Sequence, residues 1–277
     1  MANSTIKKLE KRWSKNLFIC VGLDSDYKRL PNRTGDIASD IFEFNKAIID
    51  STFDLVCAYK PNAAFYEAYG TDGLTALKKT STYLKENYPD IAVILDAKRG
   101  DIGSTNEGYV SSIFDNLKMD GVTVSPYLGQ EALEPFLERK DKLIIVLAKT
   151  SNPGSAEFQD LVVGEGGKPL YQVVAERVAR NWNKNGNCGV VVGATYPSEL
   201  VQVRKLIGDL PILIPGLGTQ GGEIENTVRS GMASGGWGMI INSSRGIIFA
   251  SDGKDFAQKA RDVAMDLNKR LLLLKDS

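Results

Sequence analysis

Histidine is absent from the 277-residue sequence, and cysteine is scarce. The lack of histidine excludes Ser-His and Cys-His nucleophilic catalysis, and it also excludes metal binding through imidazole groups. The three cysteines, Cys20, Cys57 and Cys188, lack C-x-x-C spacing and lie within apolar runs. An odd number of cysteines in such surroundings indicates buried free thiols in a reducing compartment.

Long apolar runs and an excess of charge of either sign are also missing. No stretch approaches the roughly 20 apolar residues of a membrane-spanning helix, and no segment near the N-terminus resembles a signal peptide. The 34 Lys and Arg residues balance 34 Asp and Glu residues, so no overall field attracts nucleic acid or an anionic membrane. We therefore expect a cytoplasmic protein that binds a small molecule and neither nucleic acid nor membrane.

Short apolar, β-branched runs recur along the chain, and a polar turn and a segment of helical periodicity follow them, which is typical of βα units. Eight runs are predicted to be strands: Leu17–Leu23, Phe53–Tyr59, Ile91–Asp96, Gly121–Val124, Leu143–Leu147, Gly189–Val192, Ile212–Ile214 and Met239–Asn242. In a chain close to the ~250 residues of a typical TIM barrel, they predict one α/β domain over residues 1–277, a closed (β/α)8 barrel. A helix is expected at about residues 4–15, and residues 164–169 are expected in one long loop after the fifth strand. An open doubly wound sheet is the alternative fold.

Polar residues stand where the predicted strands end. They are Asp24, Lys60, Asp96, Lys98, Thr150, Ser151, Ser243, Ser244 and Arg245. Taken singly, each is explained as well by a turn residue or a solvated charge. In a barrel, however, the loops at the C-terminal ends of the strands build the active site, so their shared position on one rim predicts a functional site.

Glycine is concentrated in the loop after the seventh predicted strand, which begins at Pro215 and has the sequence PGLGTQGG. In this fold, the loops after strands seven and eight usually bind phosphate, because backbone N–H groups can approach an anion closely there. Arg245, after the eighth strand, can supply a bidentate fork, and Gln220 can donate from the glycine-rich loop. This end of the barrel is therefore predicted to bind a phosphorylated ligand.

Charged residues are concentrated in the segment DAKRGDIGST, which spans Asp96 to Thr105. On an extended strand, Asp96 and Lys98 would project from one face roughly 7 Å apart. Such a run is usually only a solvated cluster of charges. This one directly follows the apolar strand at residues 91–95, where charges are costly unless they pair or take part in chemistry.

The DAKRGDIGST segment, together with Lys60, PGLGTQGG and SSRGI, resembles the orotidine 5'-monophosphate decarboxylase family over nearly the whole chain, in particular its bacterial type 2 branch. The resemblance implies conversion of orotidine monophosphate to uridine monophosphate and CO2 in pyrimidine biosynthesis, without a cofactor or metal. It also implies a homodimer whose active sites lie at the subunit interface.

The resemblance further implies roles for individual residues. The implied catalytic residues are Lys98, as the proton donor, with Lys60, Asp96 and Asp101. The residues implied to reach the neighbouring subunit's ligand are Asp101, Ile102 and Thr105. The implied substrate contacts are Asp24 for ribose, Ser151 for the pyrimidine, Gln220, Ser244 and Arg245 for phosphate, and also Lys60 and Pro215. Ser244 is a departure, because other branches often have glycine there.

Three other functions remain open at this point. A Mg²⁺-dependent sugar-phosphate decarboxylase or synthase of the same barrel superfamily would use a carboxylate such as Asp96 as a metal ligand. A Schiff-base aldolase would use Lys98 or Lys149, but an ammonium group flanked by carboxylates keeps its proton. A non-catalytic barrel that binds a phosphorylated ligand would not require the combination of Lys60, Asp96, Lys98 and Asp101.

Overall fold

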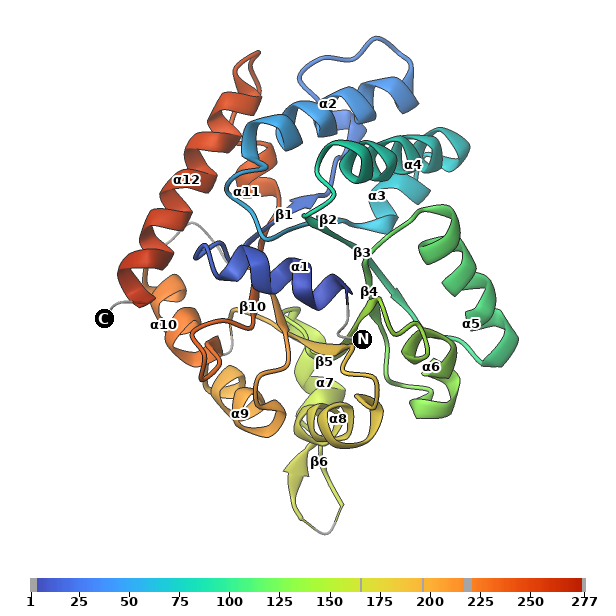
Figure 1. Ribbon diagram of the computed structural model, residues 1–277, viewed down its shortest axis with the longest axis vertical. Helices are drawn as coiled ribbons and strands as arrows, with labels where there is room; N and C mark the ends of the chain where they lie inside the picture. The colour runs from blue at the N-terminus through green and yellow to red at the C-terminus, as the bar shows by residue number, and fades with distance from the viewer. Residues whose placement is uncertain (1–3, 165, 196, 217–220, 276–277) are drawn as a thin grey trace.

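Eight parallel strands form a closed barrel at the centre of this computed structural model (Figure 1). The structure describes residues 4–164, 166–195, 197–216 and 221–275. Within these residues the barrel strands are β1 (Ile19–Leu23), β2 (Ala58–Pro61), β3 (Ala92–Arg99), β4 (Gly121–Val124), β5 (Leu143–Lys149), β8 (Cys188–Val192), β9 (Ile212–Pro215) and β10 (Met239–Ser243). They follow one another around the barrel in chain order, and β10 closes it against β1. The predicted (β/α)8 barrel is confirmed.

Helices surround the barrel and cover its outer face (Figure 1). Their bounds in the described residues are α1 (Ser4–Trp13), α2 (Ile37–Thr52), α3 (Ala63–Glu67), α4 (Gly70–Asn87), α5 (Gly103–Val110), α6 (Gly129–Leu137), α7 (Ala156–Gln159), α8 (Leu170–Arg177), α9 (Pro197–Ile207), α10 (Gly221–Gly231), α11 (Arg245–Ile248) and α12 (Phe256–Lys275). Wider π-helical turns, Ser111–Asn116 and Val178–Trp182, extend α5 and α8. Within the described part of the chain, none of these helices is long and apolar enough to cross a membrane.

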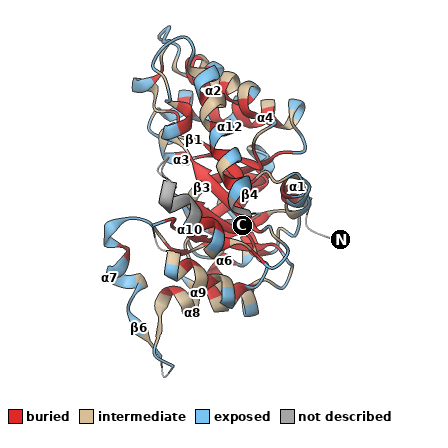
Figure 2. Cartoon of the chain, turned by 90° about the vertical axis from the view of Figure 1, so that its left-hand side faces the viewer, coloured by how far each residue is buried: buried red, intermediate tan, exposed pale blue. Residues whose placement is uncertain are grey.

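The strands are almost fully buried, and Figure 2 shows the buried residues concentrated in the barrel wall. Parallel strands with side chains packed on both faces require continuous apolar runs, which is why these segments could be recognised in the sequence. From outside, α2 contributes Ile41, Phe44 and Ile48 to the core; all three are buried, and the Phe44 ring stacks on Phe249 and Phe256. The barrel interior and the helix layer therefore form one continuous hydrophobic core.

The second strand begins later than the sequence suggested. Phe53–Tyr59 was predicted as a strand, but β2 spans Ala58–Pro61. Phe53 instead ends α2, where its N–H donates to the Ile49 carbonyl, and its ring stacks on Tyr88 at 4.8 Å between centroids. The first residues of the run therefore belong to the end of α2 and the turn after it, where Phe53 stays 38% exposed beside Tyr88. The later start carries the strand through Lys60 to the rim.

The connection after β5 has structure of its own. A 3₁₀ turn, Pro153–Ser155, leads into α7, and an antiparallel pair follows, made of β6 (Val162–Val163) and β7 (Lys168–Pro169). Figure 2 shows this excursion projecting from the body of the protein beside the barrel. The long loop that was expected to include residues 164–169 therefore contains a strand, because Lys168–Pro169 form β7 of a short hairpin.

One end of the barrel is covered by α1, which crosses its centre in Figure 1. The indole Nε1 of Trp13 donates to the Met239 carbonyl at 2.8 Å, and Thr5 Oγ1 contacts the carbonyls of Asp120 and Asp141. These acceptors lie at or just before the first residues of strands, so α1 covers the N-terminal end of the barrel. The opposite end, where the predicted polar residues lie, stays accessible.

Candidate active site

A carboxylate between two ammonium groups lies at the C-terminal ends of β2 and β3. Asp96 Oδ2 accepts a hydrogen bond from Lys60 Nζ at 3.1 Å, and Asp96 Oδ1 accepts one from Lys98 Nζ at 2.7 Å. The side chain of Lys60 is only 3% exposed and that of Asp96 12%, whereas half of Lys98 is accessible. Three of the four predicted catalytic residues therefore form one array of alternating charge.

The array holds its charges at neutral pH. Burial alone would raise the pKa of the Asp96 carboxyl, but Lys60 and Lys98 outweigh this effect and lower that pKa to about 2. Burial would likewise lower the pKa of Lys60, but the carboxylates of Asp96 and Asp24 raise it above its usual value. Asp96 and Lys60 are therefore both ionised over a wide pH range around 7.

The backbone around Lys98 departs from the extended strand that the sequence suggested. Lys98 has a φ of 46°, in the left-handed region that residues with a Cβ rarely adopt. At this point the register between β3 and β4 shifts, between Leu95 and Arg99. Asp96 and Lys98 therefore meet across a bulge. Unusual backbone of this kind is concentrated at functional sites.

Two cavities open at this end of the barrel and share Asp96 and Pro215. The first, here called the Ser151 cavity, has a volume of about 440 Å³, and its lining includes Lys98, Thr123, Thr150, Ser151, Asn152 and Gln159. The second, here called the Arg245 cavity, has a volume of about 600 Å³, and its lining includes Asp24, Arg29, Lys60, Asn242, Ser244 and Arg245. A ligand that extends through both would pass directly beside Asp96.

The Arg245 cavity is suited to an anion. Arg245 and Arg29 both line it, and neither pairs with a carboxylate of the described residues. The Arg29 guanidinium stacks over the ring of Phe249, 4.1 Å from its centroid, which orients it without neutralising it. Two guanidinium groups, each with a planar fork of donors, match the oxygen atoms of a phosphate.

Two buried acceptors in the Arg245 cavity lack a hydrogen-bond donor among the described residues. They are Asp24 Oδ1 and Asn242 Oδ1. The amide nitrogen of Asn242 is used, since it donates to Ser244 Oγ at 3.2 Å. Unsatisfied buried acceptors are rare and costly in folded proteins, so this pair is suited to receive donors from a polar ligand, such as hydroxyl groups.

Ser244 fits at the rim because residue 22 is a glycine. A Cβ on Gly22 would lie 1.9 Å from Ser244 Oγ, a distance that no side chain could tolerate. Gly22 belongs to β1, which pairs with β10, so the two strands together create the space that the serine fills. The Ser244 side chain is thus accommodated by a glycine on the neighbouring strand.

The Ser151 cavity is bordered by the excursion after β5. Gln159 accepts from the Thr150 N–H at 2.9 Å and donates to Thr150 Oγ1 at 2.8 Å, so its amide is fixed by two bonds to one residue. Beside it, the buried Lys149 Nζ contacts Asp160 at 2.5 Å. These contacts attach α7 and the residue after it to the end of β5, directly before Ser151.

The structure does not bring every predicted residue to these cavities. Asp101 lines neither, and within the described residues its carboxylate pairs with neither lysine of the array; Oδ1 accepts from the Ile102 N–H. Ile102 and Thr105 are exposed, and Ile102 is 64% accessible. The remaining predicted residue, Gln220, lies outside the described residues.

Sequence reasoning missed several residues of the site. They are Arg29, Thr123, Gln159 and Asn242. Asn242 ends the predicted eighth strand directly before the SSRGI segment, so its position was a usable signal. Arg29 lies five positions after Asp24, in a loop with many charges, and nothing in the sequence distinguishes it from its neighbours.

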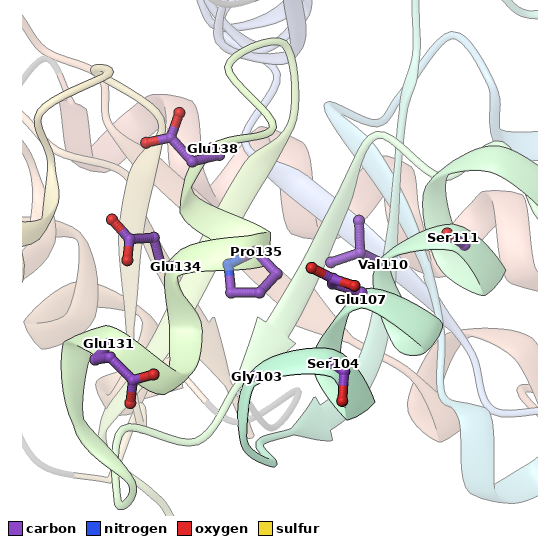
Figure 3. Close-up of a pocket in the computed structure, with 9 residues that line it drawn as sticks. All are labelled: Gly103, Ser104, Glu107, Val110, Ser111, Glu131, Glu134, Pro135 and Glu138. Carbon is purple, nitrogen blue, oxygen red and sulfur yellow. The ribbon is translucent and has the colours of Figure 1, made fainter.

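A further groove lies away from the barrel mouth, between α5 and α6 (Figure 3). It has a volume of about 670 Å³, and its lining includes the glutamates 107, 131, 134 and 138. Four carboxylates would repel an anionic ligand. The cationic end of the barrel is therefore the better candidate for binding phosphate.

The residues of the array do not favour a metal. Asp96 already accepts from two ammonium groups, and positive charge next to a carboxylate competes with a cation for it. Among the residues that the structure describes, no group of three or more Asp, Glu, Cys or His side chains is clustered as a metal site would require.

Comparison with known proteins identifies the family. Residues 18–260 match the family model described as "Orotidine 5'-phosphate decarboxylase / HUMPS family". A protein named orotidine 5'-phosphate decarboxylase from Cellvibrio japonicus is 47% identical over 271 residues, which cover 97% of this chain and 98% of that protein. One of the same name from Herpetosiphon aurantiacus is 50% identical over 246 residues, 89% of each chain.

Solved structures of proteins with related names have the same fold as this chain. The OMP decarboxylase of Leishmania donovani superposes with a TM-score of 0.85 at 37% identity, over 99% of both chains. The UMP synthase of the same organism matches with a TM-score of 0.86 at 39% identity, over 99% of this chain and 57% of the other. This protein therefore belongs to the orotidine 5'-phosphate decarboxylase / HUMPS family.

Proposed function

We propose that this protein decarboxylates orotidine 5'-monophosphate to uridine 5'-monophosphate and CO2, as a step of pyrimidine biosynthesis. The observation that carries the proposal is the Lys60–Asp96–Lys98 array at the junction of the two cavities. The names of the relatives, at 47% and 50% identity, support the same activity.

The proposed ligand extends from the Arg245 cavity into the Ser151 cavity. Its phosphate binds Arg245 and Arg29, together with the loop that contains Gln220. The ribose hydroxyl groups donate to the free acceptors of Asp24 and Asn242. The pyrimidine then lies in the Ser151 cavity, with its carboxylated carbon beside Lys98.

The proposed chemistry needs a positive charge and a proton at one carbon. When the bond from C6 to the carboxylate breaks, CO2 leaves and the electron pair stays on C6. The Lys98 ammonium stabilises this developing carbanion and transfers a proton from Nζ to C6. Asp96 positions the ammonium through its 2.7 Å bond, and half of the Lys98 side chain is exposed, so the amine can regain a proton from solvent. No cofactor or metal takes part.

We also propose that the active form is a homodimer with shared sites. Asp101, Ile102 and Thr105 lie outside the cavities of their own chain, at the edge where β3 and β4 end. Tyr127 and Leu128 follow β4 at the same edge and are 88% and 47% exposed. Exposed apolar side chains of this kind mark surfaces that pack against a partner. A second copy would bring Asp101 to the array.

The proposal is tested by following the loss of orotidine monophosphate absorbance with excess EDTA, and by identifying uridine monophosphate as the product. We expect full turnover in EDTA. No turnover under any condition would defeat the proposed function, and turnover that requires added Mg²⁺ would favour a metal-dependent member of the superfamily.

Replacing Arg245 with alanine is expected to raise KM for orotidine monophosphate by roughly 100-fold, because a bidentate phosphate contact is lost. With orotidine, which has no phosphate, the same variant should react almost as fast as the wild type. Arg29→Ala should show the same pattern with a smaller effect, since its guanidinium also packs on Phe249.

Steady-state kinetics with both substrates provide the measurement. Arg139→Ala is a matched control, since Arg139 forms an outer ion pair with Asp115 at 2.6 Å. An equal loss with both substrates would remove Arg245 from the phosphate site.

A further inference from the structure

The bulge that carries Asp96 and Lys98 is opposed by a single residue of β4. Leu95 pairs with Val122 and Arg99 pairs with Val124, so three residues of β3 lie opposite Thr123 alone. A regular ladder would give the backbone N–H groups of the bulged residues carbonyl partners on the neighbouring strand. The register shift removes those partners.

The Thr123 hydroxyl replaces them. Its oxygen accepts from the N–H of Ala97 at 3.1 Å and from the N–H of Lys98 at 3.0 Å. It also donates to Asp96 Oδ1 at 2.8 Å. A hydroxyl group has one proton and two lone pairs, so all its bonding capacity is used. Thr123 is 1% exposed, so water does not compete for these bonds.

We propose that Thr123 is a positioning residue that holds the Asp96–Lys98 pair in its reactive arrangement. Two accepted bonds fix the backbone of the bulge, in which Lys98 is kept at a φ of 46°. Because those bonds occupy both lone pairs, the hydroxyl proton must point to Asp96 Oδ1. The carboxylate is thereby oriented with Oδ1 toward Lys98 and Oδ2 toward Lys60.

The effect on turnover rests on the proposed function, while the structural role of the hydroxyl does not. Thr123 lines the Ser151 cavity, but its hydroxyl is fully used by bonds to the bulge and to Asp96, so it acts on the reaction through Asp96 and Lys98. Misplacing a catalytic group by about 1 Å can cost on the order of 100-fold in rate. A threonine in an ordinary β-branched strand therefore determines where the ammonium group lies.

The test compares Thr123→Val, which keeps the shape but loses the hydroxyl, with Thr123→Ser, which keeps the hydroxyl. We expect kcat of the valine variant to fall by about 100-fold with KM changed less than about threefold. The serine variant should stay within about fivefold of the wild type. Thr52→Val is the matched control, because Thr52 is also buried and its hydroxyl bonds Ile48 and Tyr59 away from the site. It should lose stability but keep kcat.

Amide hydrogen exchange provides a readout that needs no substrate. In the wild type, the N–H groups of Ala97 and Lys98 should be protected, and Thr123→Val should release both while Thr123→Ser restores them. If the valine variant does not fold, two measurements still test the proposal: amide exchange in the wild type and the kinetics of Thr123→Ser. Unprotected N–H groups of Ala97 and Lys98 in the wild type would contradict the proposal.

Each failure has its own signature. A wild-type protein that does not decarboxylate orotidine monophosphate defeats the proposed function but leaves the exchange result standing. If the wild type is active and Thr123→Val keeps its kcat within about threefold, the positioning role is wrong.

Discussion

Lys98→Ala is expected to lower kcat for orotidine monophosphate by about a thousandfold or more, while binding of uridine monophosphate stays measurable. The reason is that the ammonium acts mainly on charge that develops at C6 during the reaction. Binding energy from the Arg245 cavity is unaffected, because Arg29, Arg245 and Asp24 do not contact Lys98 in the described structure. The absorbance assay gives the rate, and titration calorimetry gives the affinity.

The control is Lys11→Ala, which removes a lysine from another ion pair of 2.7 Å, the one with Asp90 on the outside of the barrel. Its side chain is 55% exposed, close to the 50% of Lys98, so the two variants lose similar surface charge. The control should be fully active. Retention of a tenth of the activity by Lys98→Ala would rule out this residue as the proton donor.

The second large effect is expected when two inactive variants are mixed. If each site takes Lys98 from one chain and Asp101 from the other, pure Lys98→Ala and pure Asp101→Ala dimers should both be nearly inactive. In a hybrid dimer, one site receives both defects and the other receives two intact residues. With equal mixing, half of the dimers are hybrids and half of their sites are repaired, so activity should recover to roughly a quarter of the wild type.

Subunit exchange has to be shown independently, with two affinity tags purified in sequence. The purified hybrids should contain one working site per dimer, whatever the mixing ratio. Hybrids that form and remain inactive would mean that Lys98 and Asp101 serve the same site, and the proposal of shared sites would be wrong. A mixture of Lys98→Ala with Asp96→Asn is the matched control, because both residues belong to one array and no hybrid should recover.

The barrel could be predicted from the sequence because its strands are buried on both faces and are therefore apolar throughout. The same criterion failed at Phe53, an apolar residue that ends α2 and stacks on Tyr88 while it stays 38% exposed. An aromatic residue that stacks at the surface is as apolar in the sequence as one buried in a strand. Hydrophobicity alone therefore could not place the start of β2.

Much of the candidate site could also be predicted, because charged residues directly after a buried strand need a reason to be there. Lys60, Asp96 and Lys98 met this criterion and lie together. Thr123 did not, because a threonine between two valines is a common feature of any strand. Its role arises from the register shift in β3 opposite it. The sequence pattern of a single strand does not reveal the register in which two strands pair.

The covering of the barrel by α1 has a consequence for how the chain is made. Trp13 is synthesised before every strand of the barrel, yet its indole bonds the carbonyl of Met239, which is 226 positions later. At about 5–20 residues per second, this amphipathic segment waits on the order of 10–50 s for its last partner strand. During that time its apolar side chains have no barrel to cover, so α1 is synthesised before the barrel strands but is among the last of these elements to reach its final position.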